Sequence, residues 1–235
     1  MLHREREIGD QGKDRRCERK YPLSAADILE LRWWQRNHGQ GFAPTYPSRD
    51  VHNIYFDSPN WDSYSDNLSG ASRRTKCRLR WYGDLKAAEV ATFEAKHRRH
   101  AIGHKRQQRV PMRELGLASL PIGRLYGRLR PLLQADLRLW FDQGHMPVLY
   151  DRYRREYYAT SADIRMTVDT SIVYTLLHGG SLGKLRPLPG PAPGVLEVKY
   201  PFERRREVEE ALRRLPFRAT RCSKYALGID QLLSP

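Results

Sequence analysis

Alternation of charged and apolar residues marks a β-strand near residue 80. A strand points successive side chains to opposite faces, so the charged residues share one face and the apolar residues share the other. The first face carries Lys76, Arg78, Arg80 and Tyr82, and the second carries Cys77, Leu79 and Trp81. A strand with one solvated face has the same pattern. This segment alone therefore leaves two interpretations open, an ordinary sheet and a basic interior.

The same alternation recurs along most of the chain. The sets that share a strand face in this way are Glu18 and Lys20; Glu94 and Lys96; Tyr153, Arg155 and Tyr157; Arg165, Thr167 and Asp169; and Glu197 and Lys199. Strands of this kind can close into a barrel with an apolar outside and a charged lumen. Because most of these charges are cationic, we expect a tunnel for a polyanion.

Turn and helix signals divide the rest of the chain. We expect strands at 16–23, 51–57, 76–82, 91–98, 105–110, 147–158, 163–174 and 195–200. We expect helices from Ser24 to near Gly39, at 61–70, 203–215 and 223–233, and in a helical insertion near 112–143. Pro44, Pro47 and Ser48 mark a further loop, the Gly- and Pro-rich segment 179–194 should form another, and residues 1–15 should form a mobile leader. No second-domain boundary is visible, so residues 16–235 are predicted to form a single domain.

The charge of the chain indicates an acidic partner or substrate. Its formal charge is +15, from 42 Lys and Arg against 27 Asp and Glu. Zinc-finger spacing, the aromatic signature of an RNA-binding sheet and basic heptads are absent from the sequence. General nucleic-acid binding is therefore the second interpretation, and we expect it to be weak and non-specific.

Cysteine usage and hydropathy indicate a compartment. Three cysteines, Cys17, Cys77 and Cys222, lie far apart without a C-x-x-C pair, which is typical of a reducing environment. The first residues lack the apolar core of a signal peptide, and no run approaches the length of a membrane span. We expect a soluble, cytoplasmic protein, and the oligomeric state stays open.

Seven short motifs occur along the chain in a fixed order. They are Glu18-Arg-Lys20-Tyr, Lys76-Cys-Arg78-Leu-Arg80, Phe93-Glu-Ala-Lys96, Tyr153-Arg-Arg155, Ile164-Arg165-Met-Thr-Val-Asp169, Leu196-Glu197-Val-Lys199 and Cys222-Ser223-Lys224-Tyr225. Together they resemble the VTC domain, the polyphosphate polymerase module of the vacuolar transporter chaperone complex and of its bacterial relatives. That domain belongs to the triphosphate tunnel metalloenzymes. The resemblance covers roughly residues 16 to 233.

The resemblance implies an α+β fold, in which an antiparallel eight-stranded β-barrel forms a tunnel with flanking helices. It also implies a divalent metal, Mn²⁺ or Mg²⁺, and chemistry on triphosphate or polyphosphate chains. The wider superfamily carries an E-x-E-x-K signature on its first strand, and Arg16 stands here in place of the first Glu. This departure weakens an assignment to the adenylate-cyclase or thiamine-triphosphatase branches and suits the VTC branch.

Basic residues in such a tunnel would replace the water and counterions around a phosphate chain. Arginine grips two phosphate oxygens with its planar fork, whereas lysine acts as a compact point charge. The resemblance and the shared faces predict catalytic phosphate contacts at Lys20, Arg78, Arg80, Lys96, Arg155 and Arg165. Further phosphate contacts are predicted at Lys105, Lys199, Ser223 and Lys224. The alternative for the strand residues is a solvated face, and Ser223 also suits the N-cap of the last helix.

One carboxylate stands out as a candidate metal ligand. Glu197 alternates with Lys199 on a predicted strand and lies between apolar neighbours. Mg²⁺ or Mn²⁺ takes one or two carboxylates and shares its remaining positions with phosphate oxygens. The alternative for Glu197 is a salt bridge to a neighbouring arginine. Glu18 and Glu94 are secondary candidates, expected mainly to orient the basic residues.

Three functions are compatible with these expectations. The first is a polyphosphate polymerase that transfers the γ-phosphoryl group of ATP to a growing polyphosphate chain. The second is a hydrolase that cleaves tripolyphosphate or a nucleoside triphosphate with water as acceptor. The third is a binding module for polyphosphate or an inositol polyphosphate that performs no chemistry. The sequence does not separate polymerase from hydrolase, because both need the same cations and metal.

Overall fold

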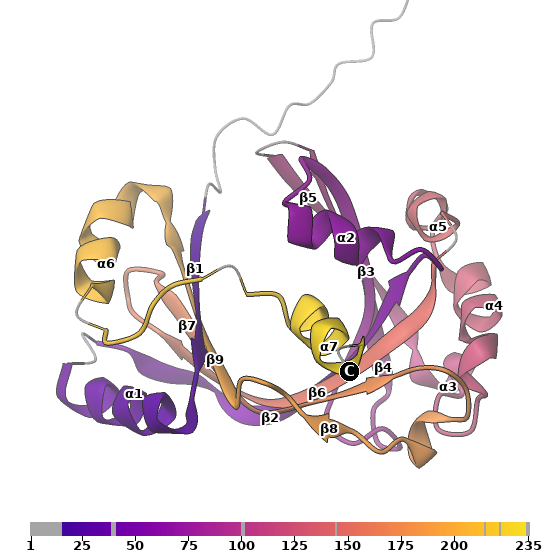
Figure 1. Cartoon of the computed structure of the whole chain (residues 1–235), viewed down its shortest axis with the longest axis horizontal. Helices are drawn as coiled ribbons and strands as arrows, with labels where there is room; N and C mark the ends of the chain where they lie inside the picture. Colours follow the sequence, from indigo (N-terminus) through magenta and orange to yellow (C-terminus); the bar gives the residue numbers. More distant parts are fainter. Residues whose placement is uncertain are drawn as a thin grey trace, which may run out of the picture.

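The computed structural model describes residues 16–38, 41–99, 102–143, 145–213, 215–220 and 222–233. The predicted leader, residues 1–15, lies outside these ranges. Within them, one antiparallel sheet is flanked by helices on several sides (Figure 1). The predicted α+β fold class is confirmed.

The sheet contains nine strands in the described part of the chain. They are β1 (Arg16–Leu23), β2 (Ala43–Asp57), β3 (Arg73–Tyr82), β4 (Val90–Arg99), β5 (Ile102–Pro111), β6 (Met146–Ala159), β7 (Arg165–Leu176), β8 (Leu188–Pro189) and β9 (Gly194–Pro201). Eight of them correspond to the eight predicted strands. The two-residue β8 pairs with β7 and lies in the segment expected to be a loop.

The sheet bends into a deep trough. Its strand order is β1-β9-β7-β6-β2-β3-β4-β5. In Figure 1, β1, β9 and β7 form one wall, β2 and β6 the floor, and β3, β4 and β5 the other wall. The predicted eight-stranded antiparallel tunnel is confirmed in its strands and curvature. Within the described residues, however, backbone hydrogen bonds do not close it, because the edge strands β1 and β5 do not pair.

Seven α-helices accompany the sheet in the described ranges. They are α1 (Ala25–His38), α2 (Asp62–Ser69), α3 (Met112–Leu115), α4 (Leu125–Leu129), α5 (Ala135–Phe141), α6 (Arg205–Leu212) and α7 (Lys224–Leu233), and 3-10 turns lie at Ile122–Arg124, Arg130–Leu132, Leu182–Lys184 and Phe202–Arg204. A reciprocal pair of hydrogen bonds starts α1, because Ser24 and Asp27 each bond the backbone amide of the other. Among these helices, none has the length and apolar composition needed to cross a membrane.

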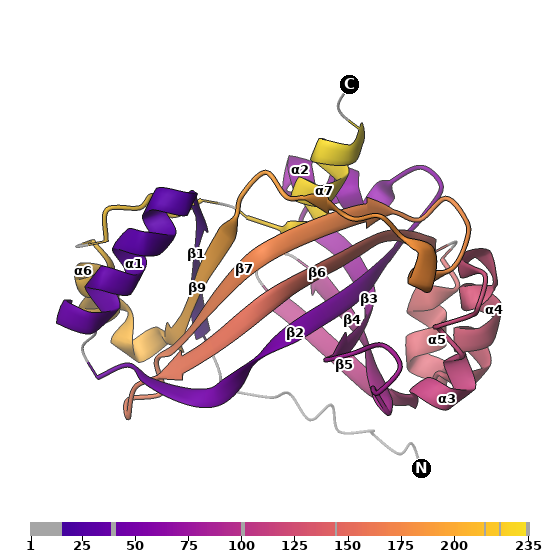
Figure 2. The ribbon, with the colours of Figure 1, turned by 90° about the horizontal axis from the view of Figure 1, so that it is seen from below.

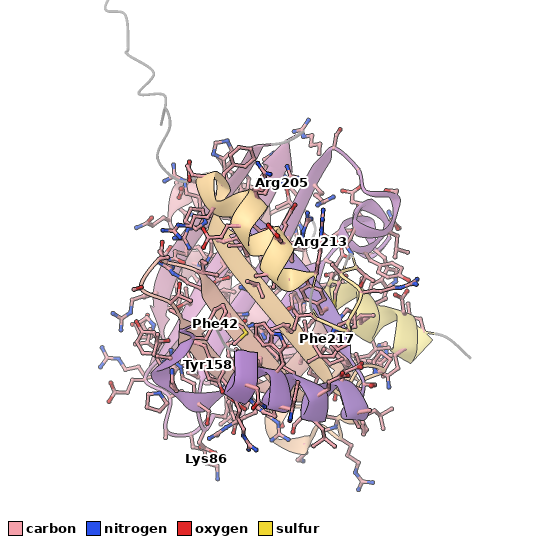
Figure 3. The ribbon with its side chains drawn as sticks, turned by 90° about the vertical axis from the view of Figure 1, so that its left-hand side faces the viewer. Phe42, Lys86, Tyr158, Arg205, Arg213 and Phe217 are labelled. Atoms are coloured by element: carbon pink, nitrogen blue, oxygen red, sulfur yellow. The ribbon has the colours of Figure 1, made fainter. Side chains whose placement is uncertain are left out.

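The outer faces of the strands are apolar, and helices cover them. Cys77, Leu79 and Trp81 point outward into a cluster that also contains residues of α3, α4 and α5. On the other side, α1 and α6 cover β1, β9 and β7 (Figure 3). Burial of this apolar surface stabilises the curved sheet from outside and leaves the charged strand faces toward its hollow.

The start of β2 differs from the expectation. A loop was predicted around Pro44 and Pro47, but β2 begins at Ala43 and pairs with β6 from there. Its register shifts between Pro44 and Tyr46 and again between Tyr46 and Arg49. The proline-containing segment pairs on one side only, since β3 begins to pair with β2 at Val51. Proline is tolerated in such one-sided, bulged strands because a missing N–H costs no ladder bond there.

Helix α7 lies inside the hollow of the sheet rather than outside it (Figures 1 and 2). It packs against β6 and β7 through an apolar cluster that includes Tyr174, Tyr225 and Ile229. The carboxylate of Asp57, fully buried at the end of β2, accepts hydrogen bonds from the Ser63 amide at the start of α2 and from the Tyr225 hydroxyl on α7. This carboxylate therefore joins both helices to the end of the trough.

The seat of α7 on the sheet depends on a glycine. A Cβ atom at Gly228 would lie 2.5 Å from Cδ1 of Tyr174 and 2.9 Å from Cδ2 of Leu149. A Cβ at Gly127 in α4 would meet nothing within 4 Å. Both glycines lie in α-helices, where alanine is intrinsically favoured.

We therefore expect opposite effects from the same substitution at these two sites. Gly228→Ala should lower the free energy of unfolding by about 1–3 kcal/mol, because overpacking outweighs the gain in helix propensity. Gly127→Ala should leave it unchanged or raise it by up to about 1 kcal/mol. Urea denaturation followed by fluorescence measures both. Equal stability of the two variants would contradict this close seat of α7.

Candidate phosphate-binding tunnel

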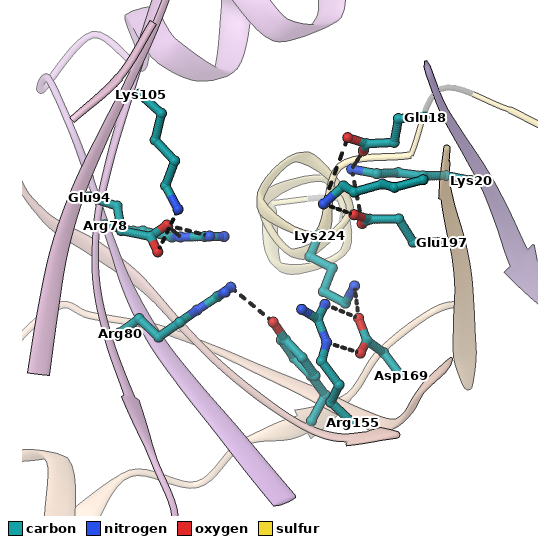
Figure 4. Close-up of polar contacts among 12 residues, drawn as sticks. Glu18, Lys20, Arg78, Arg80, Glu94, Lys105, Arg155, Asp169, Glu197 and Lys224 are labelled. Carbon is teal, nitrogen blue, oxygen red and sulfur yellow. Dashed lines mark hydrogen bonds and ion pairs between the residues drawn. The ribbon is translucent and has the colours of Figure 1, made fainter. Parts of the chain in front are cut away.

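Charged side chains from both walls and from α7 point into the hollow of the sheet (Figure 4). The basic ones are Lys20, Lys76, Arg78, Arg80, Lys96, Lys105, Arg155, Lys199 and Lys224, and the acidic ones are Glu18, Glu94, Asp151, Asp169 and Glu197. They come from seven different strands and one helix. The alternation seen in the sequence thus places one charged face of each strand toward a common space.

On one wall, Glu94 is shared by two cations. Its Oε2 accepts hydrogen bonds from Nε and Nη2 of Arg78 at 2.7 and 2.5 Å, and Lys105 Nζ lies 3.1 Å from its Oε1. Burial would raise the pKa of Glu94, but Arg78, Arg80 and Lys105 together lower it to about 2. Glu94 is therefore ionised at neutral pH, and this group of three carries one net positive charge.

Where the wall of β7 meets the floor at β6, Asp169 is also shared by two cations. Arg155 donates to its two oxygens from Nε and Nη2 at 2.6 and 2.7 Å, and Lys224 Nζ lies 2.5 Å from Oδ2. Asp169 is completely buried. Burial opposes its ionisation, but Lys224 and Arg155 keep its pKa below the ordinary value. Asp169 thereby fixes a strand arginine and the first residue of α7 in one arrangement.

On the opposite wall, two carboxylates face two lysines. Lys20 Nζ lies 2.7 Å from Glu18 and 3.5 Å from Glu197. Lys199 pairs closely with Glu197 and lies 4.0 Å from Glu18. Burial opposes both charges, yet Lys20 and Lys199 lower the pKa of Glu197, and Glu197 and Glu18 raise the pKa of Lys20. In this group the charges balance.

Arg80 is buried among neutral partners. Its Nε donates to the Asn53 side-chain oxygen at 2.7 Å, and its Nη2 donates to the Tyr153 hydroxyl at 3.0 Å. Asn53 in turn donates to the buried Asp151. Burial raises the pKa of Asp151 despite its amide donor and the nearby cations. The Asp151 carboxyl group is therefore a weaker counter-charge for these cations. The guanidinium of Arg80 is therefore held in position without a direct carboxylate contact in the described part of the chain.

Three lysines stand in a row across β3, β4 and β5. Lys76 lies opposite Lys96 in the register, and Lys96 lies opposite Lys105. Like charges directly opposite each other in a sheet are unfavourable. Lys76 Nζ bonds only with neutral oxygens, those of Asn67 at 2.6 Å and Ser223 at 3.1 Å, among the described residues.

The pKa values of two of these lysines record this crowding. Burial lowers the pKa of Lys76 to about 7, and the nearby Arg74, Lys20 and Lys96 add to the effect. Burial also lowers the pKa of Lys96, which Glu18 opposes and Lys20 and Lys199 reinforce. Glu18, Lys20 and Lys199 belong to β1 and β9, so charges on the opposite wall influence the pKa of Lys96. An anion in this space would relieve the repulsion of both lysines.

The structure brings together most of the predicted site residues. All predicted phosphate contacts except Arg165 lie in or beside the groups described above. Arg165 lies at the start of β7, where its side chain is 62% exposed and bonds Asp163 at 2.9 Å. Ser223, directly before α7, accepts the hydrogen bond from Lys76. The roles of all these residues in binding and catalysis stay predictions.

Sequence reasoning gave no role to several residues of the site. Asp169 was noticed on the face of Arg165, but its bonds to Arg155 and Lys224 were not expected. Lys76 was placed on the basic face of its strand without a function. Asn53 was missed entirely, although its two-residue spacing from Tyr55 on a predicted strand could have marked it as an inward polar side chain.

A divalent metal fits one place in this arrangement. Glu18 and Glu197 converge on the ammonium of Lys20, so their oxygens already surround a position that favours a cation. No group of three or more His, Cys, Asp or Glu side chains suited to a metal occurs in the described ranges. The protein would therefore supply at most two carboxylates, which is usual for Mg²⁺ bound together with phosphate oxygens. The alternative predicted for Glu197, a salt bridge, is present with lysines as partners.

The sequence pattern of the VTC domain matches residues 15–233. The chain belongs to the VTC domain family. No curated protein matches this VTC domain chain in sequence. Among solved structures, a Hippeastrum protein described as an adenylyl cyclase with a dominant triphosphatase activity is similar, with a TM-score of 0.56 and 12% identity over 94% of this chain and 97% of that chain. The PH1819 protein from Pyrococcus horikoshii OT3 has a TM-score of 0.49 and 13% identity, over 92% and 99% of the two chains.

The two kinds of comparison concern the family of this VTC domain and its fold. The resemblance read from the seven short motifs is confirmed by the family match. The likeness to the Hippeastrum structure, at 12% identity, concerns the fold alone, and it agrees with the predicted curved antiparallel sheet with flanking helices.

The lowered pKa of Lys76 leads to a test in solution. At pH 8, Lys76 should be mostly neutral in the free protein, and a bound phosphate chain should restore its charge. Binding of tripolyphosphate should therefore take up as much as about one additional proton at pH 8, and little at pH 6, where Lys76 is already charged. Calorimetry in buffers of different ionisation enthalpy measures the number of protons.

Two variants isolate the contribution of Lys76. Lys76→Met should remove the uptake at pH 8, whereas Lys86→Met, which alters an exposed lysine in the turn after β3, should retain it. Both titrations use the same ligand, so protons exchanged by tripolyphosphate itself cancel in the comparison. Unchanged uptake in Lys76→Met would show that Lys76 does not sense the anion.

Proposed function

We propose that this protein is a polyphosphate polymerase, which transfers the γ-phosphoryl group of ATP to a growing polyphosphate chain inside the tunnel. The observation that carries the proposal is the excess of positive charge that faces the hollow of the sheet. Arg80, Lys76 and Lys96 lack a carboxylate partner within the described residues, and Glu94 and Asp169 are each shared by two cations. An excess of positive charge that faces one hollow favours a ligand with many negative charges along a line.

The arrangement suits phosphoryl transfer, which depends mainly on positioning and on neutralising charge in the transition state. Arg78, Arg80 and Arg155 have forked donors fixed by neighbouring side chains, so they lose little freedom when they grip phosphate. In the reaction, the bond between the γ-phosphorus and the β–γ bridging oxygen breaks as a terminal phosphate oxygen of the chain bonds that phosphorus. ADP leaves with the bridging oxygen.

The metal belongs to this proposal. Mn²⁺ or Mg²⁺ would neutralise phosphate charge when bound by Glu18 and Glu197. Lys20 and Lys199 now occupy those carboxylates, and they would turn to the phosphate oxygens. Glu94 bonds Arg78 and Lys105 instead, which supports the predicted orienting role of this residue.

A hydrolase is the second candidate. The triphosphatase activity named for the structurally similar Hippeastrum protein favours it. The same cations would serve either reaction, and the acceptor alone differs: water in the hydrolase and a phosphate chain in the polymerase. The experiment must therefore identify the product rather than measure the loss of ATP.

We expect incubation with ATP and Mn²⁺ to yield polyphosphate that is visible as a ladder on a polyacrylamide gel. Free phosphate without polymer would instead identify a hydrolase, and unchanged ATP would identify a binding module. In the same assay, Arg80→Met should reduce turnover. Arg80 is the best arginine to alter, because its direct partners Asn53 and Tyr153 are neutral. Its removal therefore leaves no carboxylate without a directly paired cation.

The matched control is an arginine outside the tunnel. Arg154 lies out of phase with Arg155 and contacts Ser48 and Asp50, with its side chain 47% exposed. Loss of a charge-assisted hydrogen bond costs about 1.5–3 kcal/mol, so Arg80→Met should weaken tripolyphosphate binding about ten- to a hundredfold. Arg154→Met should leave binding unchanged. Equal affinities of the two variants would place the phosphate chain elsewhere.

Glu197→Gln tests the metal site. The substitution keeps the shape of the side chain but removes the charge that would hold a divalent ion. Metal-dependent turnover should fall at least a hundredfold or so, while binding of tripolyphosphate without metal should persist or tighten as negative charge leaves the site. Glu210→Gln on α6 serves as control. Unchanged turnover at limiting Mn²⁺ would show that Glu197 does not hold the metal.

A further inference from the structure

Three tyrosines surround an arginine on the tunnel face of β2, β3 and β6. The guanidinium carbon of Arg49 lies 4.4 Å from the ring centre of Tyr82, 5.0 Å from that of Tyr157 and 5.8 Å from that of Tyr46. Arg49 Nε also donates to the Tyr157 hydroxyl at 3.3 Å. The rings of Tyr46 and Tyr157 meet edge to face with centres 5.7 Å apart.

A backbone irregularity creates this group. Tyr46 and Arg49 are three residues apart, so a regular strand would point them to opposite faces. The register of β2 against β6 shifts between them, with Tyr46 opposite Tyr157 and Arg49 opposite Arg155. Two residue steps on β6 thus match three on β2, and both side chains reach the same tyrosine. Such bulges redirect side chains and are frequent next to active sites.

The three tyrosines and Arg49 lie next to the phosphate-binding candidates along β3 and β6. Tyr82 follows Arg80 by two residues on β3, and Tyr157 follows Arg155 by two residues on β6. A two-residue step along a strand is about 7 Å. Figure 4 shows Arg80 and Arg155 pointing into the tunnel. Lys76, which meets Ser223 before α7, lies six residues before Tyr82, about 20 Å along the strand. The aromatic group therefore lies at the end of the candidate phosphate contacts that is far from Lys76 and Ser223.

Part of this aromatic surface is exposed. Tyr46 is 62% exposed and Tyr82 is 39% exposed, and Tyr157 is half-buried. Exposed tyrosines and arginine guanidinium planes are the side chains on which nucleobases stack, whatever the identity of the base.

We propose that Tyr46, Arg49, Tyr82 and Tyr157 form a stacking platform for the nucleobase of the nucleoside triphosphate. This inference rests on the proposed function and adds the position of its substrate. A base on Tyr82 lies one two-residue step from Arg80, so its triphosphate runs into the row of cations. With the base held at the platform, the γ-phosphate is the end of the nucleotide that lies deepest among the cations.

The test compares a ligand that has a base with one that lacks it. Calorimetry without metal gives the affinities of ATP and of tripolyphosphate for the parent protein, for Tyr46→Leu and for Tyr46→Leu/Tyr82→Leu. Leucine keeps apolar bulk and removes the ring. We expect the double variant to bind ATP about tenfold more weakly and to bind tripolyphosphate as the parent does. Tyr46→Leu, at the most exposed position, should show a smaller loss for ATP alone.

The control is Phe202→Leu, which removes a ring of similar exposure, 41%, from the segment before α6. It should change neither affinity. Equal losses for ATP and tripolyphosphate in the tyrosine variants, or no loss for either, would overturn the platform and leave the proposed function standing. Failure of the parent protein to bind either ligand would overturn the proposed function, and the platform with it.

Discussion

The sheet turns more positive than negative side chains toward its hollow, and this excess of positive charge is the constraint on which the structure depends. Glu94 and Asp169 each hold two cations, while Arg80 and Lys76 bond neutral groups in the described part of the chain. Each unpaired charge costs solvation energy, and the lowered pKa of Lys76 records that cost. The fold would be more stable if each of these cations were paired with a carboxylate or exposed to water. An anionic ligand, as proposed above, would supply the missing charge.

The apolar outer face of the sheet offsets the cost of this charge arrangement. Apolar side chains such as Leu79, Trp81 and Leu196 are buried under helices outside the trough, and this burial offsets the unfavourable charges within. Helix α7 is the exception, because it packs inside the hollow and carries Lys224 to Asp169. Its apolar face occupies one part of the trough, and the charged side chains lie in the rest. Fold stability and the proposed ligand binding would therefore use different regions of the same strands.

The proposed chemistry follows from a division between the walls of the tunnel. The balanced group of Glu18, Glu197, Lys20 and Lys199 is suited to exchange partners when a metal and phosphates arrive. The groups with excess positive charge are suited to grip the chain without rearrangement, because carboxylates or amides already fix their guanidinium planes. The proposed aromatic platform would determine which end of a nucleotide enters. Polymerase and hydrolase would then differ in what reaches the γ-phosphate, water or a second chain.

The sequence by itself determined the strands and their inward faces. Period-two alternation identified Arg78, Glu94, Lys96 and Glu197 as inward residues, because the side-chain direction in a strand is a local property. The tertiary structure alone decided which charges meet. Asp169 pairs with Lys224 and Arg78 with Glu94 because of the strand order and the position of α7, which no local pattern encodes. The exposed position of Arg165 depends likewise on where the trough ends. The meeting of Tyr46 with Arg49 depends on a register shift in β2 that pairing with β6 imposes, and a strict alternation would have separated them.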